Sequence, residues 1–329
     1  MSALAPTLEA FFTDRLGRQR NASPHTVAAY RDTFRLLVGF VSARAGKPPC
    51  RLDLSDLDAA TIAGFLAHLE HDRGNAARTR NARLAAVHAF CTYAASEHPE
   101  HAGLIARVLA IPAKRHERAL ITFLSAEEAE ALLSAPDQRT WLGRRDHALI
   151  LTALQCGLRV SELTAMCCGD VHLGAGAHVR CHGKGRKDRL TPLAPATAPV
   201  LRNWLAGRGG NPAGPLFPTA SGHPLSRDAV AKLLRKHHQR ATARCPSLTT
   251  KAVTPHVLRH TAAMNLLHAG VDTTVIALWL GHEQVQTTSV YLHADLSIKE
   301  QALARTAPLN TTAGRYRPSD SLLAFLDGL

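Results

Sequence analysis

Four short stretches of the chain combine side chains that could act together on a phosphate group. They are LQCGLRVSEL with Arg159 and Glu162, GKGRKDR with Lys184, TPHVLRH with His256 and Arg259, and LGHEQVQTTSVYLH with His282 and Tyr291. Arginines carry forked, permanently charged donors that fit phosphate oxygens, and histidines can donate hydrogen bonds or move protons. A lysine at a turn can protonate a leaving oxygen, and a tyrosine can attack as a phenolic nucleophile. Together these groups predict phosphoryl transfer on a diester through a phosphotyrosine, with the arginines meeting the developing charge.

The spacing within these stretches indicates how the backbone presents the side chains. Arg159 and Glu162 are three residues apart, which places both on one face of a helix. His256 and Arg259 have the same spacing just inside an expected helix start. Lys184 lies in the glycine-bearing turn of an expected β-hairpin, and the fourth stretch opens behind a helix-ending glycine.

Each stretch taken alone has a plainer interpretation. An isolated R-x-x-E is usually a surface pair, and GKG is usually only a turn. The GKG turn is not a P-loop, because its lysine is followed by glycine instead of serine or threonine. HEQVQ differs from the zinc motif H-E-x-x-H, because position 286 is glutamine. Tyr291 alone would be a half-buried helix residue, and we interpret His260 and His293 as structural neighbours.

No metal site is expected from the sequence. The stretches contain no carboxylate cluster suited to magnesium, and no second metal pair is visible. The histidines and cysteine of one probable strand pair lack paired-ligand spacing; they are His172, His178, Cys181 and His182. The seven cysteines are odd in number and form no C-x-x-C pair, which favours reduced, mostly buried thiols.

The four stretches, in this order and at these spacings, resemble the signature boxes of the tyrosine recombinase (phage integrase) family. The resemblance covers about residues 8–305 and implies a mainly α-helical fold with a small β insert. It implies a helical, SAM-like core-binding domain followed by a catalytic domain. Carried over position by position, the catalytic residues of the family correspond to Arg159, Lys184, His256, Arg259, His282 and Tyr291. Glu162 matches the acidic residue that braces the first arginine of the family.

The resemblance also implies a reaction and its partners. Tyr291 would attack a scissile phosphate and form a 3′-phosphotyrosyl link, while Lys184 protonates the departing 5′-oxygen. A 5′-hydroxyl of the partner duplex would then reverse the step, so that no cofactor is required. Members of the family act as homo-tetramers on double-stranded DNA with paired recombination sites.

Two other functions stay open at this point. A type IB topoisomerase-like enzyme uses the same chemistry to relax DNA, but the N-terminal core-binding domain favours recombination. A catalytically silent DNA-binding protein would have little reason to retain all six catalytic positions. Within recombination, a long N-terminal domain (including residues 44–56) and an extended C-terminus favour a mobile-element integrase over chromosome-dimer resolution.

Composition agrees with a polyanionic partner. The chain has 329 residues, 46% of them hydrophobic, a formal net charge of +13 and a pI of about 9.9. Such an excess of positive charge favours nucleic acid. The sequence contains neither a long apolar run nor a secretory signal, which predicts a cytoplasmic protein without a membrane partner.

Patterning divides the chain into four parts. Residues 1–108 predict a helical core-binding, DNA-binding domain, with helices near 25–41, 56–71 and 78–95. Residues 109–124 predict a linker, and 125–310 a catalytic domain that opens on the capping box of Ser125 and Glu128. In this domain we expect a strand pair within 175–193 and helices near 194–206, 226–243, 255–269 and 273–280, and around Tyr291. Residues 311–329 are expected to form a C-terminal tail. The resemblance to the family implies that this tail docks on a neighbouring protomer, and a tail that is disordered or folded back on its own catalytic domain is the alternative.

A further group of cations could contact the DNA backbone. Arg78, Arg80 and Arg83 crowd the start of a predicted helix, where positive charge opposes the helix dipole. Lys114 and Arg115 lie in the basic linker. A phosphate backbone would offset this charge, and a solvated surface is the alternative.

Overall fold

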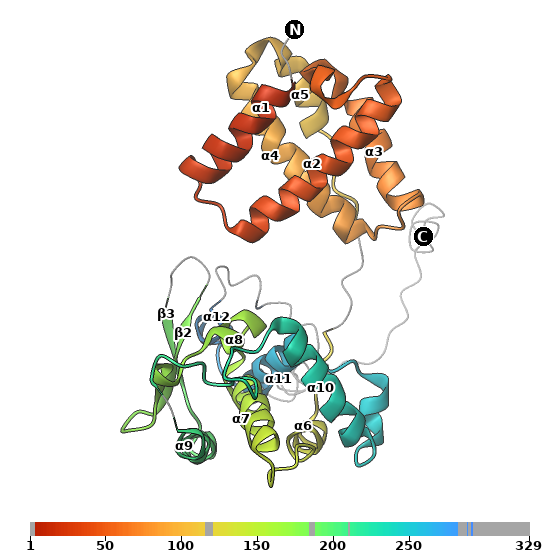
Figure 1. Cartoon of the computed structure of the whole chain (residues 1–329). Coiled ribbons are helices and arrows are strands. Elements are labelled where there is room, and N and C mark those ends of the chain that lie inside the picture. The colour runs from red at the N-terminus through yellow and green to blue at the C-terminus, as the bar shows by residue number, and fades with distance from the viewer. Residues whose placement is uncertain are drawn as a thin grey trace, which may run out of the picture. The chain divides into compact units, whose positions relative to one another are not determined.

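The computed structural model describes residues 4–115, 121–183, 188–209 and 211–281, together with Thr288 and Tyr291. The chain divides into two compact units, Met1–Arg118 and Ala119–Leu329 (Figure 1). Both are mainly helical, and the second contains a small sheet, which confirms the expected fold class. The predicted C-terminal tail lies outside the described residues, as does most of the helix predicted around Tyr291.

The N-terminal unit packs its helices around an aromatic core. Its elements are α1 (Leu4–Ala10), a π-helical segment (Phe11–Gln19), α2 (Pro24–Ala45), α3 (Ala59–His71), α4 (Ala77–Glu97), α5 (Ala102–Leu109) and short 3₁₀ turns at Pro49–Arg51, Leu54–Asp56 and Pro99–His101. Phe11 packs edge-to-face on Phe34 and Phe90, with ring centroids 6.2 and 5.5 Å apart. All three rings are at most 3% exposed, so they anchor the unit without reaching its surface.

Helix starts in this unit follow capping chemistry. Ser23 caps α2, because its hydroxyl accepts the Thr26 N–H at 3.2 Å. The helix predicted to begin at Asp56 begins later, after Asp58. The Asp58 carboxylate accepts the Thr61 N–H at 2.7 Å, which makes it the N-cap of α3.

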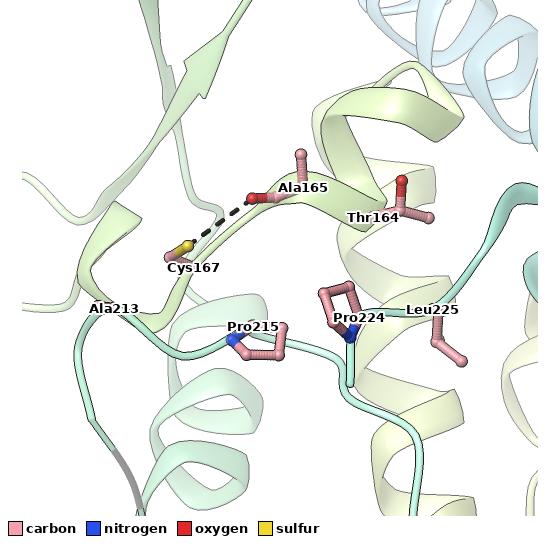
Figure 2. A pocket seen from close by; sticks show the side chains of 7 residues that line it. All are labelled: Thr164, Ala165, Cys167, Ala213, Pro215, Pro224 and Leu225. Carbon is pink, nitrogen blue, oxygen red and sulfur yellow. Dashed lines mark hydrogen bonds between the residues drawn. The ribbon is translucent and has the colours of Figure 1, made fainter. Parts of the chain in front are cut away.

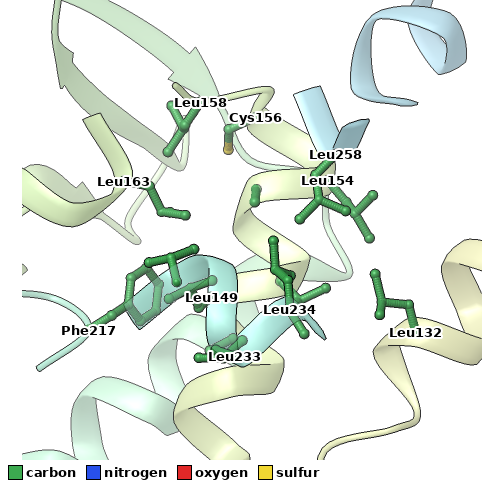
Figure 3. Close-up of a cluster of buried hydrophobic side chains, with 14 of the residues drawn as sticks. Leu132, Leu149, Leu154, Cys156, Leu158, Leu163, Phe217, Leu233, Leu234 and Leu258 are labelled. Carbon is green, nitrogen blue, oxygen red and sulfur yellow. The ribbon is translucent and has the colours of Figure 1, made fainter. Parts of the chain in front are cut away.

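The C-terminal unit is assembled around α7, a helix buried along most of its surface. Its elements are α6 (Ala126–Leu133), α7 (Trp141–Cys156), α8 (Val160–Ala165), β1 (Val171–His172), β2 (His178–His182), β3 (Asp188–Pro192), α9 (Thr197–Arg208), α10 (Arg227–Thr242), α11 (Pro255–His268), α12 (Thr273–Leu280) and 3₁₀ turns at Cys168–Asp170 and Pro246–Thr250. Helices α6, α9 and α11 contact α7, and leucines from several elements fill the space around it (Figure 3). The apolar residues of α7 follow one another in ALILTAL, so periodicity gives little helix signal for it.

The predicted first residues of this unit and its predicted helices are observed, with helix bounds that differ by a few residues. Ser125 and Glu128 form the expected capping box at α6. Helices α9 to α12 correspond to the four predicted between 194 and 280.

The three strands form an antiparallel sheet in the order β1–β2–β3. Its β2–β3 hairpin confirms the predicted strand pair, and β1 is an addition. His182 pairs with Asp188 at the last register position before the turn, and their side chains meet at 2.9 Å. The His182 ring also contacts Asp170 at 3.2 Å. The hydrogen bond to Asp188 is the largest cause of the raised pKa of His182. Through His182, the carboxylates of Asp188 and Asp170 both contact this end of the β2–β3 pair.

A buried ion cluster ties α7 to α10 and to the segment between α9 and α10. The Asp146 carboxylate accepts hydrogen bonds from Arg145 at 2.7 Å and contacts Nε2 of His237 at 2.8 Å. Arg145 also donates to the carbonyl oxygen of Pro218 at 2.8 Å. Burial raises the pKa of Asp146, but the hydrogen bonds from His237 and Arg145 outweigh it and lower the pKa overall.

Candidate active site

Arg159 and Glu162 meet at the start of α8. Gly157 ends α7 with a φ of +62°, and a Cβ at this position would lie 2.5 Å from the Leu280 side chain. A glycine therefore fits both the left-handed backbone and the close approach of α12. Arg159 then takes an extended conformation, with φ −67° and ψ 148°, as the residue before α8.

This geometry corrects one expectation. Arg159 and Glu162 do not share a helical face, because Arg159 precedes the helix. Glu162 instead reaches back from the first turn. Its carboxylate accepts the backbone N–H of Arg159 at 2.8 Å and the Nη1–H at 2.9 Å. The contact predicted from the spacing is present, but its cause is a helix start, where backbone N–H groups need acceptors.

Arg189 completes this cluster and was not singled out from the sequence. It lies on β3 and donates to both carboxylate oxygens of Glu162, at 2.9 and 2.8 Å. Burial raises the pKa of Glu162, but the paired hydrogen bonds and charge of Arg189 outweigh it and lower the pKa. The one sequence signal was its place as the last basic residue of GKGRKDR, which does not distinguish it from its neighbours.

Arg259 lies deeper, on α11. Thr254 caps this helix by accepting the Val257 N–H at 3.3 Å, so Arg259 falls in the second turn, as predicted. The Arg259 side chain is buried, at 3% exposure, and donates to the carbonyl oxygen of Gly157 at 2.7 Å. Burial and the charge of Arg159 lower its pKa to about 10, so the guanidinium stays charged at neutral pH.

The three arginines share one support, the C-terminal end of α12. They donate to three consecutive carbonyl oxygens there: Arg189 to Trp279 at 2.9 Å, Arg259 to Leu280 at 2.8 Å and Arg159 to Gly281 at 2.8 Å. Carbonyls at a helix end have no partner within the helix and carry its negative dipole end. The end of α12 therefore holds the three guanidinium groups together, although they come from separate parts of the sequence.

Two histidines of α11 lie close to one another and to Tyr291. His256 and His260 are one turn apart on α11, and their ring centroids are 4.2 Å apart. Nδ1 of His260 lies 3.1 Å from the Tyr291 hydroxyl oxygen. The structure thus corrects the interpretation of His260 as a mere neighbour, because it contacts the candidate nucleophile.

Tyr291 is buried, at 2% exposure, in a small cluster with Met264, Ile276 and Leu280. Burial raises the pKa of its hydroxyl, and the charges of Arg259 and Arg159 act in the opposite direction. The phenol therefore keeps its proton at neutral pH, and it lies within the field of both arginines. Burial also lowers the pKa of His256, with Arg259 and Arg159 adding to the effect.

The remaining predicted catalytic residues, Lys184 and His282, lie outside the described residues. Their flanking residues do belong to the site. In the sequence Lys184 falls between β2, where His182 contacts Asp188, and β3, which carries Arg189. The carbonyl oxygen of Gly281, which precedes His282, accepts a hydrogen bond from Arg159.

The predicted DNA-contacting cations of the N-terminal unit separate into two kinds. Arg78 and Arg115 are exposed, Arg83 is half-buried, and Lys114 is exposed but paired with Glu70 at 2.7 Å. Arg80 is 7% exposed and donates to the carbonyl oxygen of Pro112 at 3.1 Å. Its guanidinium holds the following segment against α4, so the structure gives Arg80 an internal role instead of a DNA contact.

The segment after α5 also differs from a free linker. The Asn81 side chain accepts the backbone N–H of Lys114 at 3.0 Å and donates to its carbonyl oxygen at 2.8 Å. Residues up to 115 therefore belong to the N-terminal unit.

A surface depression of about 370 Å³ lies elsewhere in the C-terminal unit (Figure 2). It is lined by Thr164, Ala165, Cys167, Ala213, Pro215, Pro224 and Leu225. None of the candidate catalytic residues lines it, and its walls carry no charged side chain. Within the described ranges, no group of three or more potential ligands is arranged to hold a metal ion.

Comparison with known proteins agrees with this arrangement of residues. Residues 122–297 match the phage integrase family, and residues 10–98 match the phage integrase N-terminal SAM-like domain. The integrase/recombinase y4rC of Sinorhizobium fredii is 55% identical over 328 residues, covering 100% of this chain and 99% of the relative. The chain belongs to the phage integrase family of tyrosine recombinases.

Relatives within this family include the tyrosine recombinase XerC of Pelobacter propionicus, which is 34% identical over 90% of this chain and 93% of its own length. Solved integrase and recombinase structures share the fold. XerH bound to its difH substrate has a TM-score of 0.69 at 22% identity, covering 87% of this chain and 81% of that one. The Tn1549 transposon integrase bound to circular intermediate DNA has a TM-score of 0.69 at 16% identity, covering 93% and 100%. In the described part of this recombinase, no helix is long and apolar enough to span a membrane.

Proposed function

We propose that this chain is a site-specific recombinase that cuts and rejoins double-stranded DNA through a 3′-phosphotyrosine at Tyr291. One observation carries the proposal: the Tyr291 hydroxyl is buried close enough to Arg259 and Arg159 for both charges to act on it, against the burial that raises its pKa. A scissile phosphate placed against the two guanidinium groups would be next to the nucleophile. Charged donors fixed before the reaction stabilise the added negative charge of a pentacoordinate transition state.

Cleavage of the DNA strand needs no external energy source. The Tyr291 oxygen bonds to phosphorus and the bond from phosphorus to the 5′-oxygen breaks, so one phosphodiester replaces another. Lys184, which the sequence places between His182 of β2 and Arg189 of β3, would donate a proton to the departing 5′-oxygen. Attack by a 5′-hydroxyl from a second duplex reverses the step and releases the tyrosine.

Pairing of two DNA sites requires more than one protomer, and we propose a homo-tetramer on DNA. A lambda integrase has been solved as a tetramer bound to a Holliday junction, and it shares this fold with a TM-score of 0.63 at 19% identity. We further propose a mobile-element integrase that acts in the cytoplasm. The match of the whole chain to an integrase/recombinase and the fold shared with a transposon integrase support the mobile element. The XerC relatives support chromosome-dimer resolution as the second candidate. Inverted repeats or an attachment-like site beside the gene would favour the mobile element.

A covalent-trapping experiment tests the proposal. Sheared DNA from the source genome is incubated with the protein, stopped with SDS, and recovered by potassium precipitation of protein-linked fragments. With the parent chain, the recovered fragments are expected to end at a small set of DNA sequences. Tyr291→Phe is expected to recover no protein-linked fragments while it still binds DNA. Tyr30→Phe, in the N-terminal unit, and Tyr316→Phe serve as matched controls that should trap DNA like the parent. Trapping at scattered ends, together with relaxation of any supercoiled plasmid, would instead indicate a topoisomerase-like activity.

A further inference from the structure

The nucleophile needs a group that can take its proton. Burial raises the pKa of Tyr291, so its oxygen carries hydrogen until the moment of attack. A phenol that bonds to phosphorus must release this hydrogen, and a nearby base makes the step easier. His260 is placed for this role, because its Nδ1 lies 3.1 Å from the Tyr291 hydroxyl oxygen.

The surroundings of His260 suit it to accept a proton instead of donating one. Burial, together with the charges of His256 and Arg259, lowers its pKa to about 4, so the ring is neutral at neutral pH. A neutral imidazole has one nitrogen with a free lone pair. The ring lies edge-on to both neighbours, with centroids 4.2 Å from His256 and 5.5 Å from Tyr291, which fixes its orientation.

We propose that His260 is a further catalytic residue: its Nδ1 holds the Tyr291 hydroxyl and takes its proton when the oxygen bonds to phosphorus. This inference rests on the proposed function. The O–H bond of Tyr291 breaks, the proton passes to Nδ1, and the ring becomes an imidazolium with hydrogen on both nitrogens. In the rejoining step the imidazolium returns the proton to the departing tyrosine oxygen.

The incoming DNA makes the transfer feasible. Burial is the largest cause of the low pKa of His260, and the charge of Arg259 adds to it. A phosphate bound next to Arg259 would bring negative charge close to the ring and offset that charge, so the basicity of His260 would rise when substrate is present. His256, one turn earlier on α11, is left to contact the phosphate itself.

Asparagine and alanine at position 260 separate holding the hydroxyl from taking its proton. The amide of asparagine occupies nearly the position of Nδ1 and can keep a hydrogen bond to Tyr291, but it cannot accept a proton at neutral pH. Alanine removes both functions. His268→Asn, at the end of the same helix, is the matched control for loss of a histidine.

The experiment measures single-turnover formation of the covalent adduct on a suicide duplex that carries a site recovered by trapping. His260→Asn is expected to be roughly 10²–10⁴-fold slower than the parent at unchanged DNA affinity, and His268→Asn to match the parent. Imidazole added to His260→Ala should restore part of the rate of adduct formation, and this rate should increase with the imidazole concentration. A rate for His260→Asn within about threefold of the parent would overturn the inference. Absence of adduct in the parent chain would instead refute the proposed function.

Discussion

Two buried carboxylates in the C-terminal unit are each held by two basic side chains, but they serve different ends. Asp146 lies between Arg145 and His237, and the three side chains are 4%, 9% and 1% exposed. Glu162 lies between Arg189 and Arg159, and here the exposures are 4%, 12% and 36%. The chemistry of the two clusters is similar, whereas the exposure of one cation differs.

The difference shows what a charged cluster needs in order to act on a substrate. Arg145 directs its donors to Asp146 and to the carbonyl oxygen of Pro218, so the cluster is closed within the core. Arg159 is fixed by Glu162 and by the end of α12, yet a third of its side chain faces solvent. The guanidinium of Arg159 is therefore held in place by the protein but keeps one edge exposed. It is ready to bind a phosphate before the substrate arrives.

The largest expected effect is on catalysis. Arg159→Ala should slow adduct formation by roughly 10²–10³-fold or more, because a donor aimed at the transition state is lost. Arg145→Ala should leave the rate per folded molecule close to that of the parent. Single-turnover rates, corrected for the folded fraction by circular dichroism, make the comparison. Equal losses in both variants would remove the distinction between the two clusters.

The second effect is on stability. Asp146→Ala should lower the free energy of unfolding by roughly 3–5 kcal/mol, because a buried cation loses its partner. The pKa of Asp146 is lowered in the folded chain, so its stabilising contribution is present above the ordinary aspartate pKa and is lost only as pH falls below about 4. The free energies of unfolding of parent and variant, from urea titrations at neutral pH and at about pH 2, should therefore converge on acidification. A difference that grows as pH falls would contradict this assignment.

A smaller catalytic effect is expected at Arg189. Arg189→Lys keeps the charge but loses the fork that engages both oxygens of Glu162, so Arg159 should be less well placed. We expect adduct formation to slow by roughly 10–10²-fold. Arg180→Lys on β2, where the side chain is 46% exposed and paired with Asp170, is the control and should behave like the parent. A parental rate for Arg189→Lys would show that the fork is not required.

The smallest effects concern the N-terminal unit. Arg78→Ala should weaken DNA binding uniformly and reduce the slope of log affinity against log salt by about one, as expected for one lost phosphate contact. Arg80→Ala should leave that slope unchanged and instead destabilise the unit, because its guanidinium binds Pro112. A change of slope in Arg80→Ala would restore its predicted role at the DNA.

Much of the site was predictable because it depends on local spacing. Helix starts at Ser125 and Thr254, the hairpin of β2 and β3, and the pairing of Arg159 with Glu162 all follow from neighbours in sequence. The support of the arginines by α12 was not predictable in this way. It joins residues about a hundred positions apart through backbone carbonyls, which every residue carries and no motif marks.

His260 and Arg80 show what the sequence could not predict: His260 has a role in the site that was not expected, and Arg80 lacks the DNA contact that was expected. His260 follows Arg259 directly, and only the position of Tyr291 gives it a role in the site. Arg80 has the same residue type and helix as Arg78, and only the path of the chain near Pro112 distinguishes them. Residue type and spacing indicate which groups are available, whereas tertiary contacts decide which of them face the substrate.

The most direct test of the account is to identify the residue that carries the DNA. Adducts trapped on the suicide duplex are digested with nuclease and trypsin, and the nucleotide-bearing peptide is sequenced by mass spectrometry. We predict a nucleotide linked through its 3′-phosphate to Tyr291. A nucleotide on Tyr316 or on another side chain, or a link through a 5′-phosphate, would contradict the proposed mechanism.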